Sequence, residues 1–257
     1  LMTENHTAYT TYGGKSNMDC KYLYLYTDCF GGDTAYVSTL YRGLTVSSTW
    51  DSGSTYNQEH VWPKSKCQTD KEIGDIMHLR PANPQENSTR GNTAYGESAG
   101  YYDPGVSVRG DCARMVLYMY VRWGNTANMW GSSGVMENVD VLLGWMEQDP
   151  VDTWEMGRND SVQSITGTRN VFVDYPELAW QLFGKTIPEN MTTPSDGGIP
   201  EGSTGGSTGD PDTDETQPDE TQPGDMTAKL ATQGDTLSVG DRIIIAAAEY
   251  DFALGTV

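Results

Sequence analysis

The chain has 257 residues, of which 36 are Asp or Glu and only 16 are Lys or Arg, so its formal net charge is −20. A protein that binds nucleic acid tightly over an extended surface is expected to be basic, and this composition argues against that class. An enzyme that meets a polyanion through a metal ion and a few local cations is not excluded. The sequence contains no apolar run long enough to cross a membrane.

The composition divides the chain into three parts. Residues 1–194 hold 14 basic and 23 acidic residues, so even this part is acidic, at about −9. Residues 195–225 hold nine acidic residues, no Lys or Arg, and much Gly, Ser, Thr and Pro, which is typical of a self-repelling, disordered linker. Residues 226–257 are too few to bury a core alone, and their apolar stretch predicts the start of a truncated β-rich module.

The first sixty residues predict short elements. The aromatic residues of 21–26 favour a strand, and the apolar spacing of 36–44 favours a helix. A further strand ends at Glu59 and His60, because Pro63 cannot continue a central ladder. Neighbouring side chains on a strand point to opposite faces. The side chains of Glu59 and His60 can therefore belong to one site only if the chain turns just after His60.

A second strand and a helix are predicted to follow. We expect the strand within 73–79 and the helix over 84–90, with Asn83 as its N-cap and Pro84 in its first turn. Asn87 then lies one turn into the helix, where it can face a metal ion held by the first strand.

The rest of residues 1–194 is predicted to be mainly helical. Residues 112–123 are apolar nearly all round, which indicates a buried helix. Three more helices are expected: 137–148, a helix that Asp149 caps and Pro150 opens and that runs to about Ile165, and one that begins at 174–177 and ends near Gly184. The fold class is therefore α+β.

The candidate site combines four kinds of side chain. The carboxylate of Glu59 can hold a hard divalent cation, and the imidazole of His60 can accept a proton near neutral pH. Asn87 offers a neutral oxygen, and Arg90 offers a fork of donors that can bind phosphate or, alternatively, pin backbone carbonyls. These residues predict a site for one metal ion, one water and one phosphodiester, in which His60 activates the water.

Several ordered motifs resemble those of a known family. They are Asn57-x-Glu59-His60-Val61-Trp62-Pro63-x-Ser65, His78-Leu79-Arg80-Pro81, Asn87-x-x-Arg90-Gly91-Asn92, Arg114-Met115-Val116-Leu117-Tyr118-Met119, Pro150-Val151-Asp152-Thr153-Trp154-Glu155-x-x-Arg158-Asn159 and Gly167-x-x-Asn170-x-Phe172-x-Asp174. Together they resemble the endonuclease I family of secreted or periplasmic nucleases, in the His-Me finger (ββα-metal) superfamily, over roughly residues 5–185.

The resemblance implies a ββα-metal finger packed with several helices. It implies a metal-dependent endonuclease that cleaves DNA, RNA or both and leaves 5′-phosphates, with His60 as general base and Glu59 and Asn87 as metal ligands. Mg²⁺ is the expected cofactor, with Mn²⁺ and Ca²⁺ as alternatives. We expect little sequence specificity, because no base-reading element is evident, and we expect a secreted monomer.

Further residues near these motifs have a supporting role or no assigned role. His78, Arg80 and Asn92 are candidates for supporting or phosphate contacts, with a structural role favoured for Arg80. The family often has two adjacent histidines before its Leu-x-Pro step, and Met77 replaces the first here, so His78 has no assigned role. The loop after His60 contains three lysines, Lys64, Lys66 and Lys71. They predict either a local binding site for phosphate or simply solvated side chains.

The sequence contains four cysteines, which bear on the redox environment of the protein: Cys20, Cys29, Cys67 and Cys112. An even number in a linker-bearing, acidic chain fits an oxidising, extracellular setting, with Cys20–Cys29 and Cys67–Cys112 as the preferred pairs and four reduced thiols as the alternative. The Leu1-Met2 start does not resemble a natural beginning, so we expect that a secretion signal has been removed or is not included in the sequence.

The alternative function belongs to another class. The acidic core and the appended β-rich segment also suggest a secreted surface-binding protein with an inactive nuclease-like core. The intact Glu59, His60 and Asn87 argue against it, because a dead enzyme would be free to lose them. A metalloprotease is disfavoured because the sequence lacks a His-Glu-x-x-His helix.

Overall fold

The computed structural model describes residues 2, 5–189, 191 and 194, apart from the side chain of Phe30, and the backbone of 229–230 and 243–244. The chain divides into two units, Leu1–Pro211 and Asp212–Val257. In the second unit, β6 (Lys229–Leu230) pairs in parallel with β7 (Ile243–Ile244). The predicted linker, 195–225, and the rest of the predicted β-rich module lie outside the described residues.

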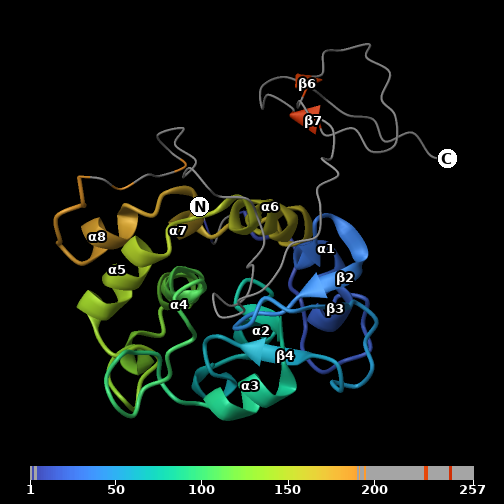
Figure 1. The fold of residues 1–257 in the computed structure, drawn as a ribbon, viewed down its shortest axis with the longest axis horizontal. Helices are drawn as coiled ribbons and strands as arrows, with labels where there is room; N and C mark the ends of the chain where they lie inside the picture. The colour runs from blue at the N-terminus through green and yellow to red at the C-terminus, as the bar shows by residue number, and fades with distance from the viewer. Residues whose placement is uncertain are drawn as a thin grey trace, which may run out of the picture. The chain divides into compact units, whose positions relative to one another are not determined.

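The described part of the first unit is α+β, with short antiparallel strands and α-helices of 4 to 15 residues (Figure 1). Its N-terminal elements are η1 (Cys20–Tyr22), α1 (Tyr24–Thr27), β1 (Cys29–Phe30), β2 (Asp33–Ser38) and β3 (Thr45–Ser47). The middle contains β4 (Asn57–His60), η2 (Lys64–Lys66), α2 (Asp70–Ile73), β5 (Leu79–Ala82) and α3 (Pro84–Arg90). The remaining elements are α4 (Arg109–Trp123), η3 (Thr126–Asn128), α5 (Val139–Gln148), α6 (Thr153–Thr166), α7 (Val171–Asp174) and α8 (Leu178–Leu182).

The predicted ββα unit is present as β4, β5 and α3. The two strands are antiparallel and place Glu59 opposite Arg80 and His60 opposite Leu79. Asn83 is the N-cap of α3, as predicted, because its Oδ1 accepts hydrogen bonds from the backbone N–H groups of residues 85 and 86 at 2.9 and 3.3 Å. The helix ends at Gly91, whose φ of +55° favours glycine.

The predicted second strand over 73–79 is wrong in its position. Thr69 caps the short helix α2 by accepting a hydrogen bond from the N–H of Glu72, so Ile73 is helical. The Asp75 side chain then accepts from the N–H of Met77 and turns the chain, and the strand begins only at Leu79. This insertion of α2 brings the carbonyls of its last turn beside β4.

Two predictions in the first sixty residues are also wrong. Residues 21–26 form η1 and α1 instead of a strand, because the Asp19 side chain accepts from the N–H of Lys21 and starts a helical turn. Residues 36–44 continue β2 and a turn instead of a helix. Tyr36 pairs with Ser47 across β2 and β3, and Gly43 turns the chain with φ +57°.

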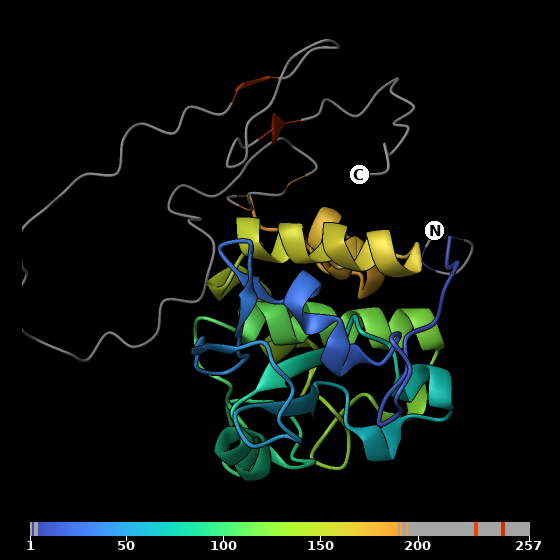
Figure 2. The same cartoon turned by 90° about the vertical axis from the view of Figure 1, so that its right-hand side faces the viewer.

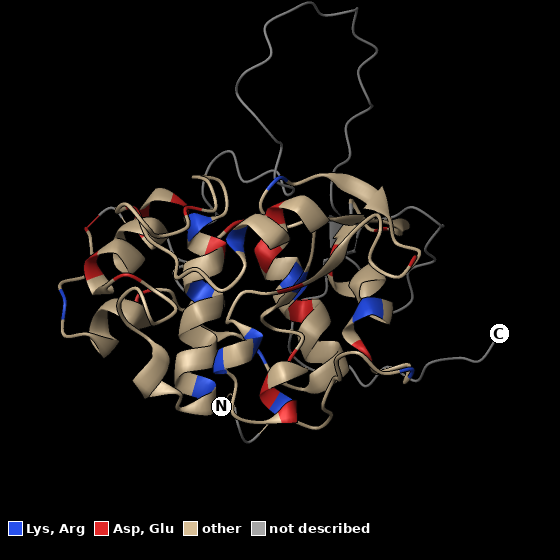
Figure 3. Cartoon of the chain, turned by 90° about the horizontal axis from the view of Figure 1, so that it is seen from below, with Lys and Arg blue, Asp and Glu red and all other residues tan. Residues whose placement is uncertain are grey.

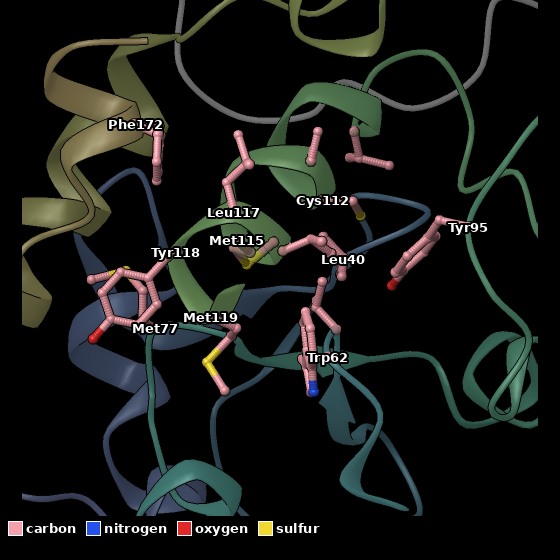
Figure 4. Packing of buried hydrophobic residues seen from close by; sticks show 14 of the residues in the cluster. Leu40, Trp62, Met77, Tyr95, Cys112, Met115, Leu117, Tyr118, Met119 and Phe172 are labelled. Carbon is pink, nitrogen blue, oxygen red and sulfur yellow. The ribbon is translucent and has the colours of Figure 1, made fainter. Parts of the chain in front are cut away.

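The core is built around α4, which lies between α6 and α3 in both views (Figures 1 and 2). Val116 and Leu117 on α4 are fully buried and belong to the same apolar cluster as Trp62 and Tyr95 (Figure 4). The predicted helix over 112–123 is confirmed and begins earlier, at Arg109. Among the described residues, no helix is long and apolar enough to span a membrane.

The later helices match the predictions except at their ends. Asp149 does not cap the helix that follows it; its Oδ2 accepts from the N–H of Gly110 at 2.8 Å and so caps α4. The true N-cap of α6 is Asp152, which accepts from the N–H of Glu155 at 2.7 Å. The last predicted helix corresponds to α8, and the short helix α7, which was not predicted, precedes it.

All four cysteines are free thiols in the structure, so the expected disulfides are absent from it. Cys20 and Cys112 are fully buried, whereas Cys29 and Cys67 are partly exposed. The Cys20 thiol is directed to the carbonyl of Gly74 at 3.3 Å and that of Cys67 to the carbonyl of Pro63 at 3.8 Å. Both preferred pairs thus join a buried thiol to one nearer the surface.

Candidate active site

Helix α3 lies against β4 through two pairs of side chains. The amide Nδ2 of Asn87 donates to Oδ1 of Asn57 at 2.7 Å, and Nη1 of Arg90 donates to Oε1 of Glu59 at 3.1 Å. Asn57 and Glu59 are two residues apart on a strand, and Asn87 and Arg90 three apart on a helix, so each pair shares one face of its element. The structure therefore brings three predicted site residues, Glu59, Asn87 and Arg90, to one strand–helix contact.

The Glu59 carboxylate is buried and held by specific donors. Its Oε1 accepts hydrogen bonds from Arg90 and from the hydroxyl of Tyr41, which in turn lies 2.8 Å from the hydroxyl of Tyr95. Burial raises the pKa of Glu59, while Arg90 and then Tyr41 oppose that rise. Among the described contacts, both hydrogen bonds fall on Oε1, so Oε2 is the oxygen that could meet a ligand.

Arg90 is almost fully buried, and its guanidinium contacts the protein. Besides Glu59, Nη1 donates to the carbonyl of His60 and Nη2 to the carbonyl of Val61, both at 2.8 Å. Its guanidinium also lies over the ring of Tyr95 at 4.5 Å. Of the two roles that the sequence leaves open, this geometry fits the pinning of backbone carbonyls and of Glu59.

The His60 ring is held by a different element. Its Nε2 lies 3.0 Å from the carbonyl oxygen of Ile73, at the end of α2. A carbonyl can only accept, so Nε2 carries the proton and Nδ1 carries the lone pair. Burial, with smaller contributions from Lys64 and Arg90, lowers the pKa of His60 to about 4. At neutral pH the ring is therefore a neutral imidazole, and its Nδ1 lone pair can accept a proton.

His78, which had no assigned role, holds the neighbouring carbonyl. It is fully buried, and its Nε2 lies 2.8 Å from the carbonyl oxygen of Glu72, while the ring centroids of His60 and His78 are 5.5 Å apart. The two imidazoles thus bind successive carbonyls at the C-terminal end of α2, where carbonyls lack partners within the helix. His78 acts structurally, by fixing α2 against β4.

The other two predicted contacts lie away from this group. The guanidinium of Arg80 pairs with the buried Asp28 and stacks on Trp154 at 4.4 Å, which fits the structural role that the sequence favours. Asp28 also accepts from Arg158 at 3.1 Å, so it joins two cations in the interior. Asn92 is exposed, two residues beyond α3.

A family comparison adds to this geometry. The family model for Endonuclease I matches residues 3–103 and 98–177, which include every candidate site residue. This chain belongs to the endonuclease I family. It is 37% identical over 178 residues to an extracellular ribonuclease of Bacillus amyloliquefaciens and 38% identical over 178 residues to one of Bacillus subtilis (strain 168). Each alignment covers 57% of this chain and 61% of the relative, so the chain spans about three fifths of the length of these relatives.

The donor atoms of this endonuclease I family member bear on which metal ion could bind at the site. Within the described residues, no group of three or more His, Cys, Asp or Glu side chains could hold one. The strand–helix contact instead offers one carboxylate, from Glu59, and the amide oxygens of Asn57 and Asn87. Because Asn87 donates through Nδ2, its Oδ1 remains an acceptor. Such hard oxygen donors fit an ion like Mg²⁺, which keeps several of its waters.

Four residues of the site were not predicted from the sequence: Tyr41, Asn57 and Tyr95, whose hydrogen bonds are given above, and Tyr12, whose ring lies edge to face against that of His60. Asn57 could have been found, because it lies two residues before Glu59 on the same strand and so shares its face. The tyrosines come from segments with no local signal, and Tyr41 lies in the stretch that was wrongly predicted as a helix. The three loop lysines differ in their environment. Lys66 donates to the carbonyl of Ser133, while Lys64 and Lys71 are exposed.

Proposed function

We propose that this protein is a secreted, metal-dependent endonuclease that hydrolyses phosphodiester bonds in RNA, DNA or both. The observation that carries the proposal is the His60 ring, whose Nε2 is fixed to the carbonyl of Ile73, which leaves the lone pair of Nδ1 to accept a proton. Membership of the endonuclease I family and the similarity to two extracellular ribonucleases support both the chemistry and the secretion.

Each residue has a distinct part in the proposed reaction. His60 accepts a proton from the attacking water at Nδ1, and general-base catalysis of this kind contributes about 10²–10⁴-fold in rate. Glu59 and Asn87, with Asn57 beside them, would hold an Mg²⁺-like ion. When bound, such an ion would neutralise negative charge on the phosphate. Arg90 keeps the Glu59 carboxylate and the backbone after β4 in place. We expect 5′-phosphate products.

Sequence specificity should be weak. Lys, Arg, Asp and Glu residues are interspersed over the described elements (Figure 3), so the substrate meets a few local cations instead of one broad basic face. Contacts with phosphate position a nucleic acid but do not report its bases. The net charge of −20 also disfavours tight binding of long duplexes.

The roles of His60 and Glu59 can be separated by experiment. His60→Ala should lower the cleavage rate of plasmid and RNA by about 10²-fold or more while Mg²⁺ binding, measured by calorimetry, is little changed. Glu59→Gln or Asn87→Ala should weaken Mg²⁺ binding, and excess metal should partly restore cleavage. Glu147→Gln, on the exposed face of α5, is the matched control and should behave like the unmodified protein.

Two outcomes would overturn the proposal. Full cleavage in the presence of EDTA would exclude the metal, and cleavage by His60→Ala at the parental rate would exclude its role as the base. An unmodified chain that binds Mg²⁺ but cleaves neither substrate would favour the alternative, a surface-binding protein with an inactive nuclease-like core.

A further inference from the structure

Residues 6–12 form an N-terminal strap that is bonded to three other parts of the chain. The N–H of Thr7 donates to the carbonyl of Thr166 at 2.8 Å, and the N–H of Thr11 donates to that of Met18 at 2.8 Å. Between them, the buried hydroxyl of Thr10 donates to the carbonyl of Gly74 and accepts from the N–H of Ile76 at 3.1 Å. The strap is therefore a fixed part of the fold.

The strap lies against the backbone that holds His60. A Cβ atom on Gly74 would be 2.6 Å from the carbonyl oxygen of Thr10 and 2.9 Å from the Cα of Thr11, so only glycine permits this approach. Gly74 directly follows Ile73, whose carbonyl binds His60. The strap is thus one wall of the candidate active site.

Two tyrosines of the strap pair with the two exposed lysines. Tyr12 packs edge to face with His60, with 4.6 Å between ring centroids, and the Nζ of Lys64 lies 4.7 Å from the centroid of Tyr12. Tyr9 is 39% exposed, and the Nζ of Lys71 lies 3.9 Å from its centroid. His6 extends this row, because its ring stacks on Tyr9 at 4.2 Å.

We propose that the strap, with Lys64 and Lys71, is a binding track for single-stranded nucleic acid beside the scissile phosphate. Bases stack on Tyr12 and Tyr9, and the two ammonium groups hold the flanking phosphates. Rings that accept any base, combined with cations that follow the backbone, are what single-strand binders use. This inference rests on the proposed nuclease function and names the form of the substrate.

The contacts within the track do not prevent such binding. A cation–π contact at an exposed site is weaker than the stacking of a base on an aromatic ring, so an exposed lysine can leave the ring and bind a phosphate instead. A duplex keeps its bases stacked on each other and cannot use the rings. The track therefore favours single strands, and it does so for RNA and DNA alike, because every base has a π face.

Binding without cleavage tests the track directly. The full chain in EDTA is titrated into fluorescein-labelled oligouridylate, oligothymidylate and duplex DNA of about twelve nucleotides per strand, a length within the range that single-strand binders cover. Tyr12→Leu and Tyr9→Leu should each weaken binding of both single strands by roughly 5- to 150-fold and leave duplex binding unchanged. Tyr12→Phe, which keeps the ring, should bind as the unmodified chain does.

Matched controls come from elements that do not belong to the track. Tyr36→Leu, on β2, removes a tyrosine that is 46% exposed and should leave binding unchanged. Lys71→Met should reduce the dependence of single-strand affinity on salt by about 0.7 in the log–log slope. Lys185→Met removes a lysine that pairs with Asp140 and should not change this slope.

The outcomes separate this inference from the nuclease proposal. If the leucine variants bind single strands as the unmodified chain does, the track is wrong even where cleavage is normal. A loss confined to the RNA probe would also overturn it, since stacking does not depend on the sugar. If the rings matter for binding but no probe is cleaved in Mg²⁺, the track stands and the nuclease proposal fails.

Discussion

Glu59 and His60 are adjacent in the sequence, yet different elements hold their side chains. Arg90 of α3 and the hydroxyl of Tyr41 bind Glu59, whereas the last carbonyl of α2 binds His60. The strand ends at His60, as the sequence predicts, so the alternation of side chains directs the two groups toward different neighbours. One short strand can therefore position a carboxylate and an imidazole independently.

The Tyr41 hydroxyl should matter both for stability and for metal binding. Burial, then the nearby Glu59, raise the pKa of Tyr41 well above its usual value, so its hydroxyl stays protonated and donates to the carboxylate. Tyr41→Phe should lower the free energy of unfolding by about 1.5–3 kcal/mol, as expected for a hydrogen bond to a charged group. It should also weaken Mg²⁺ binding by about 10–100-fold. Denaturant unfolding and calorimetry measure the two effects.

Tyr24→Phe is the matched control for this change. Tyr24 is also fully buried, but its hydroxyl has no hydrogen-bond partner among the residues that the structure describes, so its removal should be neutral or stabilising. If Tyr41→Phe and Tyr24→Phe had the same effect on stability and on metal binding, Tyr41 would not be holding Glu59.

The site residues that the sequence reveals are those linked by local geometry. Glu59, His60 and Asn87 lie in two short motifs, and the spacing of one strand and one capped helix is enough to bring them near each other. Tyr41 and Tyr12 reach the site only through tertiary contacts, from segments whose local pattern gave a wrong prediction or none. Single-sequence reasoning has no access to such contacts.

The elements that were predicted correctly have strong local signals. Helix α3 has its cap and its proline, and α4 has an unbroken apolar surface that suits a buried helix. The failures are short elements, where tertiary pairing overrides the pattern. Residues 36–38 look helical by spacing, but pairing with β3 makes them a strand. Helix α2 has only four residues and depends on its Thr69 cap.

Because α2 is so short, the histidines at its end should couple its stability to pH. Burial, then the neighbouring His60, lower the pKa of His78 well below its usual value of about 6.5. Folding thus favours the neutral ring of His78. The full free energy of unfolding is therefore reached above about pH 6.5, where the ring is neutral in the unfolded chain too. As the pH falls below that value, protonation of the unfolded chain lowers the free energy of unfolding by up to about 1.4 kcal/mol per pH unit. His78→Gln, which can still donate to the Glu72 carbonyl, should remove this sensitivity.

Thermal or denaturant unfolding at several values between about pH 4.5 and 7.5 measures the difference between the two proteins. The unmodified chain should lose stability more steeply than His78→Gln as the pH falls below the usual pKa of histidine. The difference isolates His78 from other buried groups, such as Asp149, whose pKa burial raises to about 7. Parallel curves would show that His78 is not kept neutral by the fold.

At the scale of the whole molecule, the described region reaches close to the proposed boundary at residue 194. Ile187 and Met191 are partly buried and pack against the apolar core, so the folded domain includes them. Residues 195–257 contain 13 acidic residues against Lys229 and Arg242, which gives about −11 of the formal charge of −20. More than half of the net charge thus lies outside the nuclease-like domain.

This distribution of charge predicts how truncation affects cleavage. A chain ending at Pro194 should fold and keep its chemistry, because every proposed catalytic and metal-binding residue lies at or before Arg90. At limiting substrate and low salt it should cleave faster than the full chain, since like-charge repulsion of the polyanionic substrate is reduced. The gap should close at high salt, where repulsion is screened.

Cleavage rates and thermal melts of both chains, each at two salt concentrations, measure the predicted difference in rate and the stability of the truncated chain. A truncated chain that melts much earlier, or that is slower at saturating substrate, would show that residues beyond 194 complete the domain or contact the substrate.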